Sequence, residues 1–243
     1  MIRLILFFLL IPSLLFAGQG MGPGPGFKKY TGGGGYMTPA YVNSNSGYTS
    51  GPATLSGVTA GNALIVGVSD ITTLASATVS GGCAASWQSV TQGACGTLAK
   101  TYTRFFYCEN ATGGSASVTL GSLGSDPGWS IHEYSGIAQS SSIISSPYVC
   151  NPNSILGSYS TANMTFSQPG VIVTINADEQ SDIFTSWGAS QNARTVQATH
   201  VHRTSDRIIS SNADYASSVT TTDCSPYCDV DMLQSIALKA RSN

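Results

Sequence analysis

The chain has 243 residues, of which 9% are charged and 42% are hydrophobic, and its formal net charge is −2 at pH 7. Nucleic-acid binding depends on clustered Lys and Arg that neutralise phosphates, so a chain with so few charges is not expected to bind nucleic acid. The high apolar content also excludes an intrinsically disordered chain.

The N-terminus has the layout of a secretory signal peptide. Arg3 precedes an apolar run, residues 4–16, and a small side chain follows at Ala17. This run is shorter than the roughly 20 residues that a membrane span needs, so we predict a signal peptide, residues 1–17, and no permanent membrane span. The product is expected to be secreted or held at the cell surface, in the extracellular or periplasmic space.

Residues 18–40 are rich in Gly and Pro, which is typical of a flexible arm. Three aromatic residues in this arm, Phe27, Tyr30 and Tyr36, offer an alternative in which the arm docks onto a neighbouring subunit or the cell envelope. The remainder, residues 41–243, has a length that a single sandwich or barrel commonly occupies, so we predict one folded domain.

After the arm, short runs of β-branched and aromatic residues alternate with Gly, Ser, Asn and Asp, which is the pattern of strands and turns. No window of about 11 residues shows a helical apolar period, so helix is expected to be nearly absent. The predicted strands are residues 63–69, 86–91, 101–108, 115–121, 129–136, 171–177, 195–202, 206–213, 217–222 and 233–240.

These signals occur in the same order in both halves of the chain. In each half a long apolar strand is followed by a tryptophan, Trp87 or Trp187, and then by three further strands. The correspondence predicts two similar sets of strands packed face to face. We therefore predict an all-β fold: a jelly-roll-like antiparallel β-sandwich of two packed sheets, supported by disulfides.

Between two of the predicted strands, the segment 109–115 has the sequence ENATGGS. Its paired glycines, Gly113 and Gly114, accept the positive φ of a hairpin turn. We therefore predict that the flanking strands are antiparallel neighbours.

All six cysteines follow the signal peptide, and an even number in an exported chain predicts disulfides. The two pairs closest along the chain would each close a local loop, and the remaining two cysteines would join distant segments. The predicted bonds are accordingly Cys83–Cys95, Cys224–Cys228 and Cys108–Cys150. A zinc site is the alternative, but the C-x₃-C spacing has no histidine nearby and no second matching pair. We therefore predict no metal and no cofactor.

Two groups of titratable residues have both a functional and a structural interpretation. Glu133 with Glu109 or Asp178 offers the carboxylate pair of a glycosidase; alternatively, Glu133 binds backbone groups at a strand end. His200 and His202 form an H-x-H pair that a strand projects to one side, as two metal ligands would be. Exposed strand histidines are the commoner explanation, and no catalytic residue is predicted.

Aromatic side chains offer the remaining candidates for ligand contact. Tryptophans within the strands of a sandwich usually belong to its core, which is where we expect Trp87, Trp129 and Trp187. Tyrosines in or near predicted loops are better candidates as flat platforms for sugar rings. The predicted ligand-binding residues are Tyr148, Tyr159, Tyr215 and Tyr227.

Four segments carry a family resemblance: GNALIVGVS at 61–69, FFYCENATGGSASVTLG at 105–121, EYSGIA at 133–138 and SIALKA at 235–240. With these the chain resembles a loosely related group of bacterial exported and phage-associated β-sandwich proteins. The resemblance implies a jelly-roll-like fold and carries over no catalytic residue.

The leading hypothesis for function is an exported, non-catalytic binding or structural module at the cell surface that recognises glycans. The first alternative is a self-assembling subunit of an extracellular filament or layer, with identical subunits as partners. The second is a carbohydrate-active hydrolase that uses Glu133.

Overall fold

The computed structural model describes residues 35–49, 51–96, 101–125, 127–151, 157–178, 184–197, 201–221 and 231–243. They belong to one compact unit, Gly34–Asn243, so Tyr36, which the sequence places in the arm, is part of the folded unit. The predicted signal peptide and most of the predicted arm lie outside the described residues. Within the described ranges, no helical segment has the length and apolar character of a membrane span.

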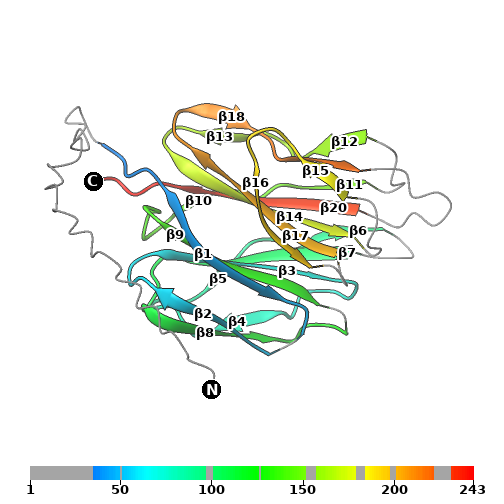
Figure 1. The fold of residues 1–243 in the computed structure, drawn as a ribbon, viewed down its shortest axis with the longest axis horizontal. Coiled ribbons are helices and arrows are strands. Elements are labelled where there is room, and N and C mark those ends of the chain that lie inside the picture. The colour runs from blue at the N-terminus through cyan, green and yellow to red at the C-terminus, as the bar shows by residue number, and fades with distance from the viewer. Residues whose placement is uncertain are drawn as a thin grey trace, which may run out of the picture. The chain divides into compact units, whose positions relative to one another are not determined.

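The first half of the chain forms one large and one small antiparallel sheet (Figure 1). The strands of the first large sheet are, in spatial order, β1 (Ala40–Gly47), β9 (Gly128–Ser135), β3 (Ala63–Asp70) and β7 (Thr101–Cys108), followed by β5 (Gln88–Ser89) and β6 (Gly93–Cys95), which both pair with β7. The first small sheet contains β2 (Pro52–Val58), β8 (Gly114–Gly121) and β4 (Thr78–Ser80).

The second half forms the same two kinds of sheet. The strands of the second large sheet are β16 (Asn192–Gln197), β17 (Val201–Ile209), β14 (Gly170–Asp178) and β20 (Asp231–Lys239), followed by β10 (Ile143–Ser145) and β11 (Tyr148–Asn151), which both pair with β20. The second small sheet contains β12 (Gly157–Ser160), β19 (Ser218–Thr221) and β15 (Phe184–Trp187). A separate pair is formed by β13 (Met164–Phe166) and β18 (Ala213–Tyr215).

The two halves have the same strand connectivity. In the first large sheet β3 lies between β7 and β9, and in the second β14 lies between β17 and β20. The next-to-last strand of each half along the chain, β8 or β19, is the central strand of the small sheet of that half. The predicted repeat and the all-β, antiparallel sandwich class are therefore confirmed. The jelly-roll part is not confirmed, and the described strands form five sheets where two were predicted, because each half divides its strands unequally between a large and a small sheet.

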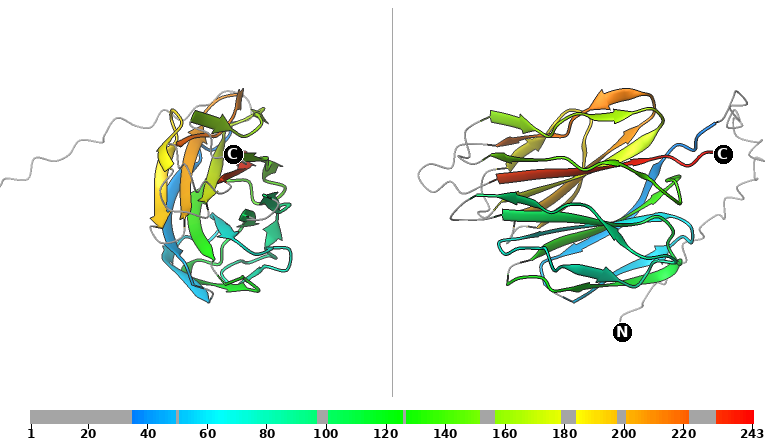
Figure 2. Two further views of the ribbon diagram at one scale, coloured as in Figure 1. Left: turned by 90° about the vertical axis from the view of Figure 1, so that its right-hand side faces the viewer. Right: turned by 180° about the vertical axis from the view of Figure 1, so that it is seen from behind.

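The sheets stack in layers with the two large sheets in the middle (Figure 1), and Figure 2 shows the same order from behind. Because strand side chains alternate, each large sheet buries both faces. Val66 and Val118 belong to a core between the first large and first small sheets. Ile65 and Val173 belong to the core between the large sheets, and Ile172 to a third core under β13 and β18.

The central strands β3 and β14 approach each other closely at Gly67. A Cβ atom on this residue would lie 2.8 Å from Cδ1 of Ile175 and 3.2 Å from Cε1 of Phe105. A glycine within a strand often marks such a close approach. Gly67 therefore helps to set the spacing between the two halves.

Two disulfides join described cysteines, Cys83–Cys108 and Cys95–Cys150. Disulfide bonding of these residues is confirmed, but their predicted pairing is wrong. Cys83 and Cys95 lie at opposite ends of β7: Cys95 pairs with Thr101, whereas Cys83 lies near Cys108. The predicted Cys224–Cys228 bond lies outside the described residues.

The Cys95–Cys150 disulfide has a particular place in the fold. Cys95 is on β6 and Cys150 is on β11, which are edge strands of the first and second large sheets. This bond therefore joins the two halves covalently, whereas Cys83–Cys108 lies within the first half.

The segment 109–115 connects β7 in the large sheet to β8 in the small sheet. The predicted hairpin between antiparallel neighbours is therefore wrong. Gly113 and Gly114 do have positive φ angles, 82° and 73°. They turn the chain from one layer to the next, because a positive φ permits a turn but does not decide which sheet the following strand joins.

Candidate functional site

The four tyrosines predicted to bind a ligand do not form one platform. Tyr148 is on β11, Tyr159 on β12 and Tyr215 on β18, which belong to three different sheets. Tyr148 is the exposed member of these three, at 46%. Tyr227 lies outside the described residues.

Tyr159 and Tyr215 take part in packing. The hydroxyl of Tyr159 accepts a hydrogen bond from Nδ2 of Asn176 at 3.0 Å. The Tyr215 ring packs edge-on against Phe166, and the Arg207 guanidinium lies 4.4 Å from its centroid. Both tyrosines are half-buried, which limits the ring face that a ligand could reach.

The three tryptophans differ in burial. Trp129 is buried in the first core, as expected, and its Nε1 donates to the carbonyl oxygen of Thr49 at 2.9 Å. Trp87 is half-buried against the same core, donates to Gly81 O at 2.7 Å, and lines a surface hollow of about 360 Å³. Trp187 is half-buried on β15.

The carboxylates considered for hydrolysis have structural partners. Glu133 is fully buried, and its Oε1 accepts hydrogen bonds from the Thr59 amide at 2.9 Å and from Asn62 Nδ2 at 2.5 Å. Glu109 accepts a hydrogen bond from a backbone amide, and Asp178 ends β14 in the other half of the chain. This arrangement matches the structural interpretation of Glu133.

The histidines of the described chain are buried between the two large sheets. In His202, Nδ1 lies 2.9 Å from Oγ of Ser69 and Nε2 lies 3.0 Å from Oγ of Ser130. Burial lowers the pKa of both His202 and His132 to about 3. His200 lies outside the described residues, and within them no group of three or more His, Cys, Asp or Glu side chains is placed to hold a metal ion.

The segments that follow the last strand of each half, β9 and β20, pair with each other. Ile137, just after β9, forms an antiparallel bridge with Ala240, just after β20. Tyr36 then bridges Ser242 in the same antiparallel sense. The start of the folded unit and the final segments of both halves therefore meet at one place.

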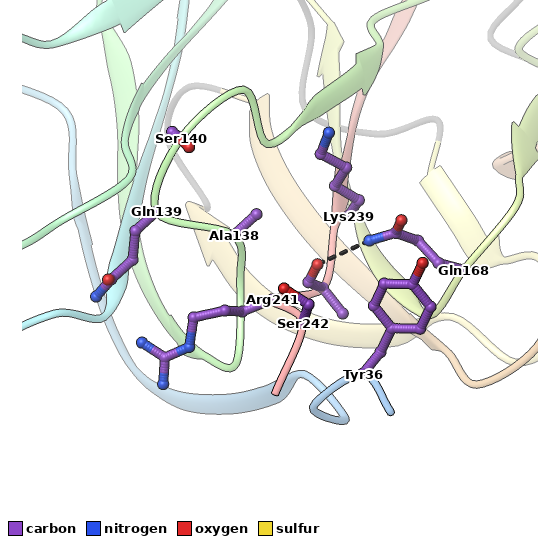
Figure 3. A pocket seen from close by; sticks show the side chains of 9 residues that line it. Tyr36, Ala138, Gln139, Ser140, Gln168, Lys239, Arg241 and Ser242 are labelled. Carbon is purple, nitrogen blue, oxygen red and sulfur yellow. Dashed lines mark hydrogen bonds between the residues drawn. The ribbon is translucent and has the colours of Figure 1, made fainter. Parts of the chain in front are cut away.

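A pocket of about 580 Å³ opens at this meeting point, and we call it the junction pocket (Figure 3). Because its walls come from four separate segments of both halves, it requires the halves to be docked together, and ligand sites are common at such interfaces. Its lining residues are Tyr36, Ala138, Gln139, Ser140, Gln168, Lys239, Ala240, Arg241 and Ser242.

The two glutamines of the junction pocket are oriented by the fold. Nε2 of Gln168 donates to Ala240 O at 2.8 Å, as Figure 3 shows, and Nε2 of Gln139 donates to Gly61 O at 3.0 Å. Their amide oxygens are thereby left as hydrogen-bond acceptors. The Tyr36 side chain, which is 43% exposed, also lines the pocket, so the pocket combines an aromatic ring with polar acceptors.

Sequence reasoning missed this pocket because its residues are spread along almost the whole folded chain. The sequence pattern places Tyr36 in the arm, and Gln139 and Gln168 belong to no motif. The one available signal was the pair of cations, Lys239 and Arg241, at the end of an otherwise uncharged and largely apolar segment, residues 232–241.

No protein-family model, no curated protein and no solved structure matches this chain. The resemblance to exported and phage-associated proteins therefore stays a prediction.

Proposed function

We propose that the protein is an exported, non-catalytic binding module that recognises a saccharide in the junction pocket. The observation that carries this proposal is the combination of the exposed Tyr36 ring with the acceptor oxygens of Gln139 and Gln168. An aromatic ring packs against the apolar face of a sugar, and fixed amide oxygens accept hydrogen bonds from its hydroxyls.

Two further observations support this proposal. The disulfides Cys83–Cys108 and Cys95–Cys150 are typical of a protein that folds in an oxidising, extracytosolic compartment. No carboxylate lines either the junction pocket or the hollow beside Trp87, so neither offers the acid pair of a glycosidase.

A glycan array probed with the secreted chain, followed by calorimetry on its best ligand, tests the proposal. Tyr36→Ala is expected to weaken binding about tenfold, because the ring supplies much of the buried contact. Tyr148→Ala is the matched control, since this equally exposed tyrosine lies outside the pocket. Loss of binding in Tyr148→Ala alone would move the site to β11, and an array without any bound saccharide would refute the proposal.

The assembly alternative is separable by experiment. If the arm joins neighbouring copies, deletion of residues 18–34 should convert large assemblies into monomers in analytical ultracentrifugation. This deletion spares Tyr36 and its bridge to Ser242, so it leaves the junction pocket in place.

A further inference from the structure

The junction pocket carries positive charge that no lining residue balances. Lys239 and Arg241 line it, and no carboxylate does. The ion pair between Arg194 and Asp206 lies elsewhere, since neither residue lines the pocket.

Both cations retain hydrogen-bonding capacity. Nε and Nη2 of Arg241 lie 3.3 and 3.1 Å from Sδ of Met37, and a thioether is a weak acceptor. The Lys239 ammonium forms no hydrogen bond or ion pair with any described residue. Figure 3 shows the Lys239 and Arg241 side chains extending in different directions, Lys239 from the end of β20 and Arg241 from the segment that follows it, so the charge is spread over the pocket.

We propose that the saccharide bound in the junction pocket is anionic, with carboxylate or sulfate groups bound separately by Lys239 and by Arg241. This inference rests on the proposed function and specifies its ligand class. A concave site with uncompensated cations attracts anions, and a guanidinium binds two oxygens of such a group through parallel hydrogen bonds. A neutral saccharide would use Tyr36 and the glutamines but leave both cations unpaired.

Binding of matched oligosaccharides to the full secreted chain tests this assignment. We would compare a neutral glucan, its uronic-acid counterpart and its sulfated counterpart by calorimetry. The uronate or the sulfated form is expected to bind at least tenfold more tightly than the neutral form. Its affinity should fall as salt rises from about 50 to about 500 mM, because salt screens exposed charges.

Substitutions then locate the anion. Lys239→Gln and Arg241→Gln are each expected to weaken anionic binding about tenfold while leaving neutral binding unchanged, since each removes one charged hydrogen-bond donor. Arg241→Lys should retain part of the affinity. Arg207→Gln removes the same charge from outside the pocket and should change nothing, with thermal unfolding as a check on folding.

The outcomes separate the two proposals. Equal, salt-independent affinity for neutral and anionic saccharides would overturn the anionic assignment and leave saccharide binding standing. Unchanged anionic affinity in Lys239→Gln and Arg241→Gln would overturn it as well. Absence of binding to all saccharides would overturn both.

Discussion

The guanidinium carbon of Arg194 lies 3.8 Å from the centroid of the Tyr41 ring. Arg194 is on β16 and Tyr41 is on β1, so this contact joins the outer edge strands of the two large sheets. Nη2 of Arg194 also lies 2.9 Å from Oδ1 of Asp206, whose other oxygen accepts a hydrogen bond from the Tyr134 hydroxyl at 2.8 Å. A cation and a buried carboxylate thus hold one side of the interface between the halves.

Replacing Arg194 should leave the buried Asp206 carboxylate without its cationic partner. Asp206 is fully buried, so Arg194→Met is expected to lower the free energy of unfolding by about 2–3 kcal/mol, which is less than for a fully buried pair because Arg194 is partly exposed. Urea unfolding measures the loss. Arg194→Met combined with Asp206→Asn should recover part of it, and a double variant less stable than Arg194→Met would show that the stranded charge is not the cause.

The opposite side of the same interface depends on the Cys95–Cys150 disulfide. Its sequence separation is 55 residues, against 25 for Cys83–Cys108. The chain-entropy model then predicts that replacing both Cys95 and Cys150 by alanine costs about 4 kcal/mol, roughly 0.7 kcal/mol more than the same change at Cys83 and Cys108. Guanidinium unfolding of the two double variants measures both losses. A larger loss at Cys83–Cys108 would contradict the model.

The fold was predictable where neighbouring residues determine it. The apolar run at 63–69 appears as β3 (Ala63–Asp70), because a strand buried on both faces gives a continuous apolar pattern. The repeat of signals also predicted two similar sets of strands. The predicted strand 195–202 was wrong, since β16 ends at Gln197 and β17 begins at Val201. Both segments are rich in β-branched residues, so composition did not reveal the boundary.

Features that depend on contacts between distant segments were not predictable. The partner of Cys95 is decided by the edge-to-edge approach of β6 and β11, which spacing along the chain does not encode. The junction pocket likewise requires Tyr36 to lie beside Ser242. His132 and His202 become buried partners of the interface only when the two large sheets pack together.

Buried histidines should make stability fall in mild acid. Burial lowers the pKa of His132 to about 3 from an ordinary 6.5, so below pH 6.5 the unfolded chain binds a proton that the folded chain does not. The stability that each neutral histidine contributes is therefore fully present above pH 6.5. It is lost by about 1.4 kcal/mol per pH unit as the pH falls from 6.5 towards about 3.

His132→Leu tests this dependence, because neither His132 ring nitrogen has a hydrogen-bond partner among the described residues. The free energy of unfolding of the variant should equal or exceed that of the natural protein at pH 7, and the difference in its favour should be about 2 kcal/mol larger at pH 5. His202→Leu should show the same pH-dependent gain, but its free energy of unfolding at pH 7 should be lower, because the buried Ser69 and Ser130 hydroxyls lose their hydrogen-bond partner. A pH-independent difference in His132→Leu, measured by urea unfolding, would contradict the assignment.

Asp231 should act in the opposite direction. Burial, and then repulsion from Asp178, raise its pKa from 3.8 to about 7. Between these values the unfolded chain has released a proton that the folded chain keeps, so stability falls as pH rises from about 4 to about 7 and is constant above. Asp231→Asn removes the ionisation, and relative to the natural protein it should gain about 4 kcal/mol between pH 4 and pH 8. Unfolding free energies measured across this range test the prediction. The same pH dependence in the natural protein and in Asp231→Asn would contradict it, because it would mean that folding does not raise the pKa of Asp231.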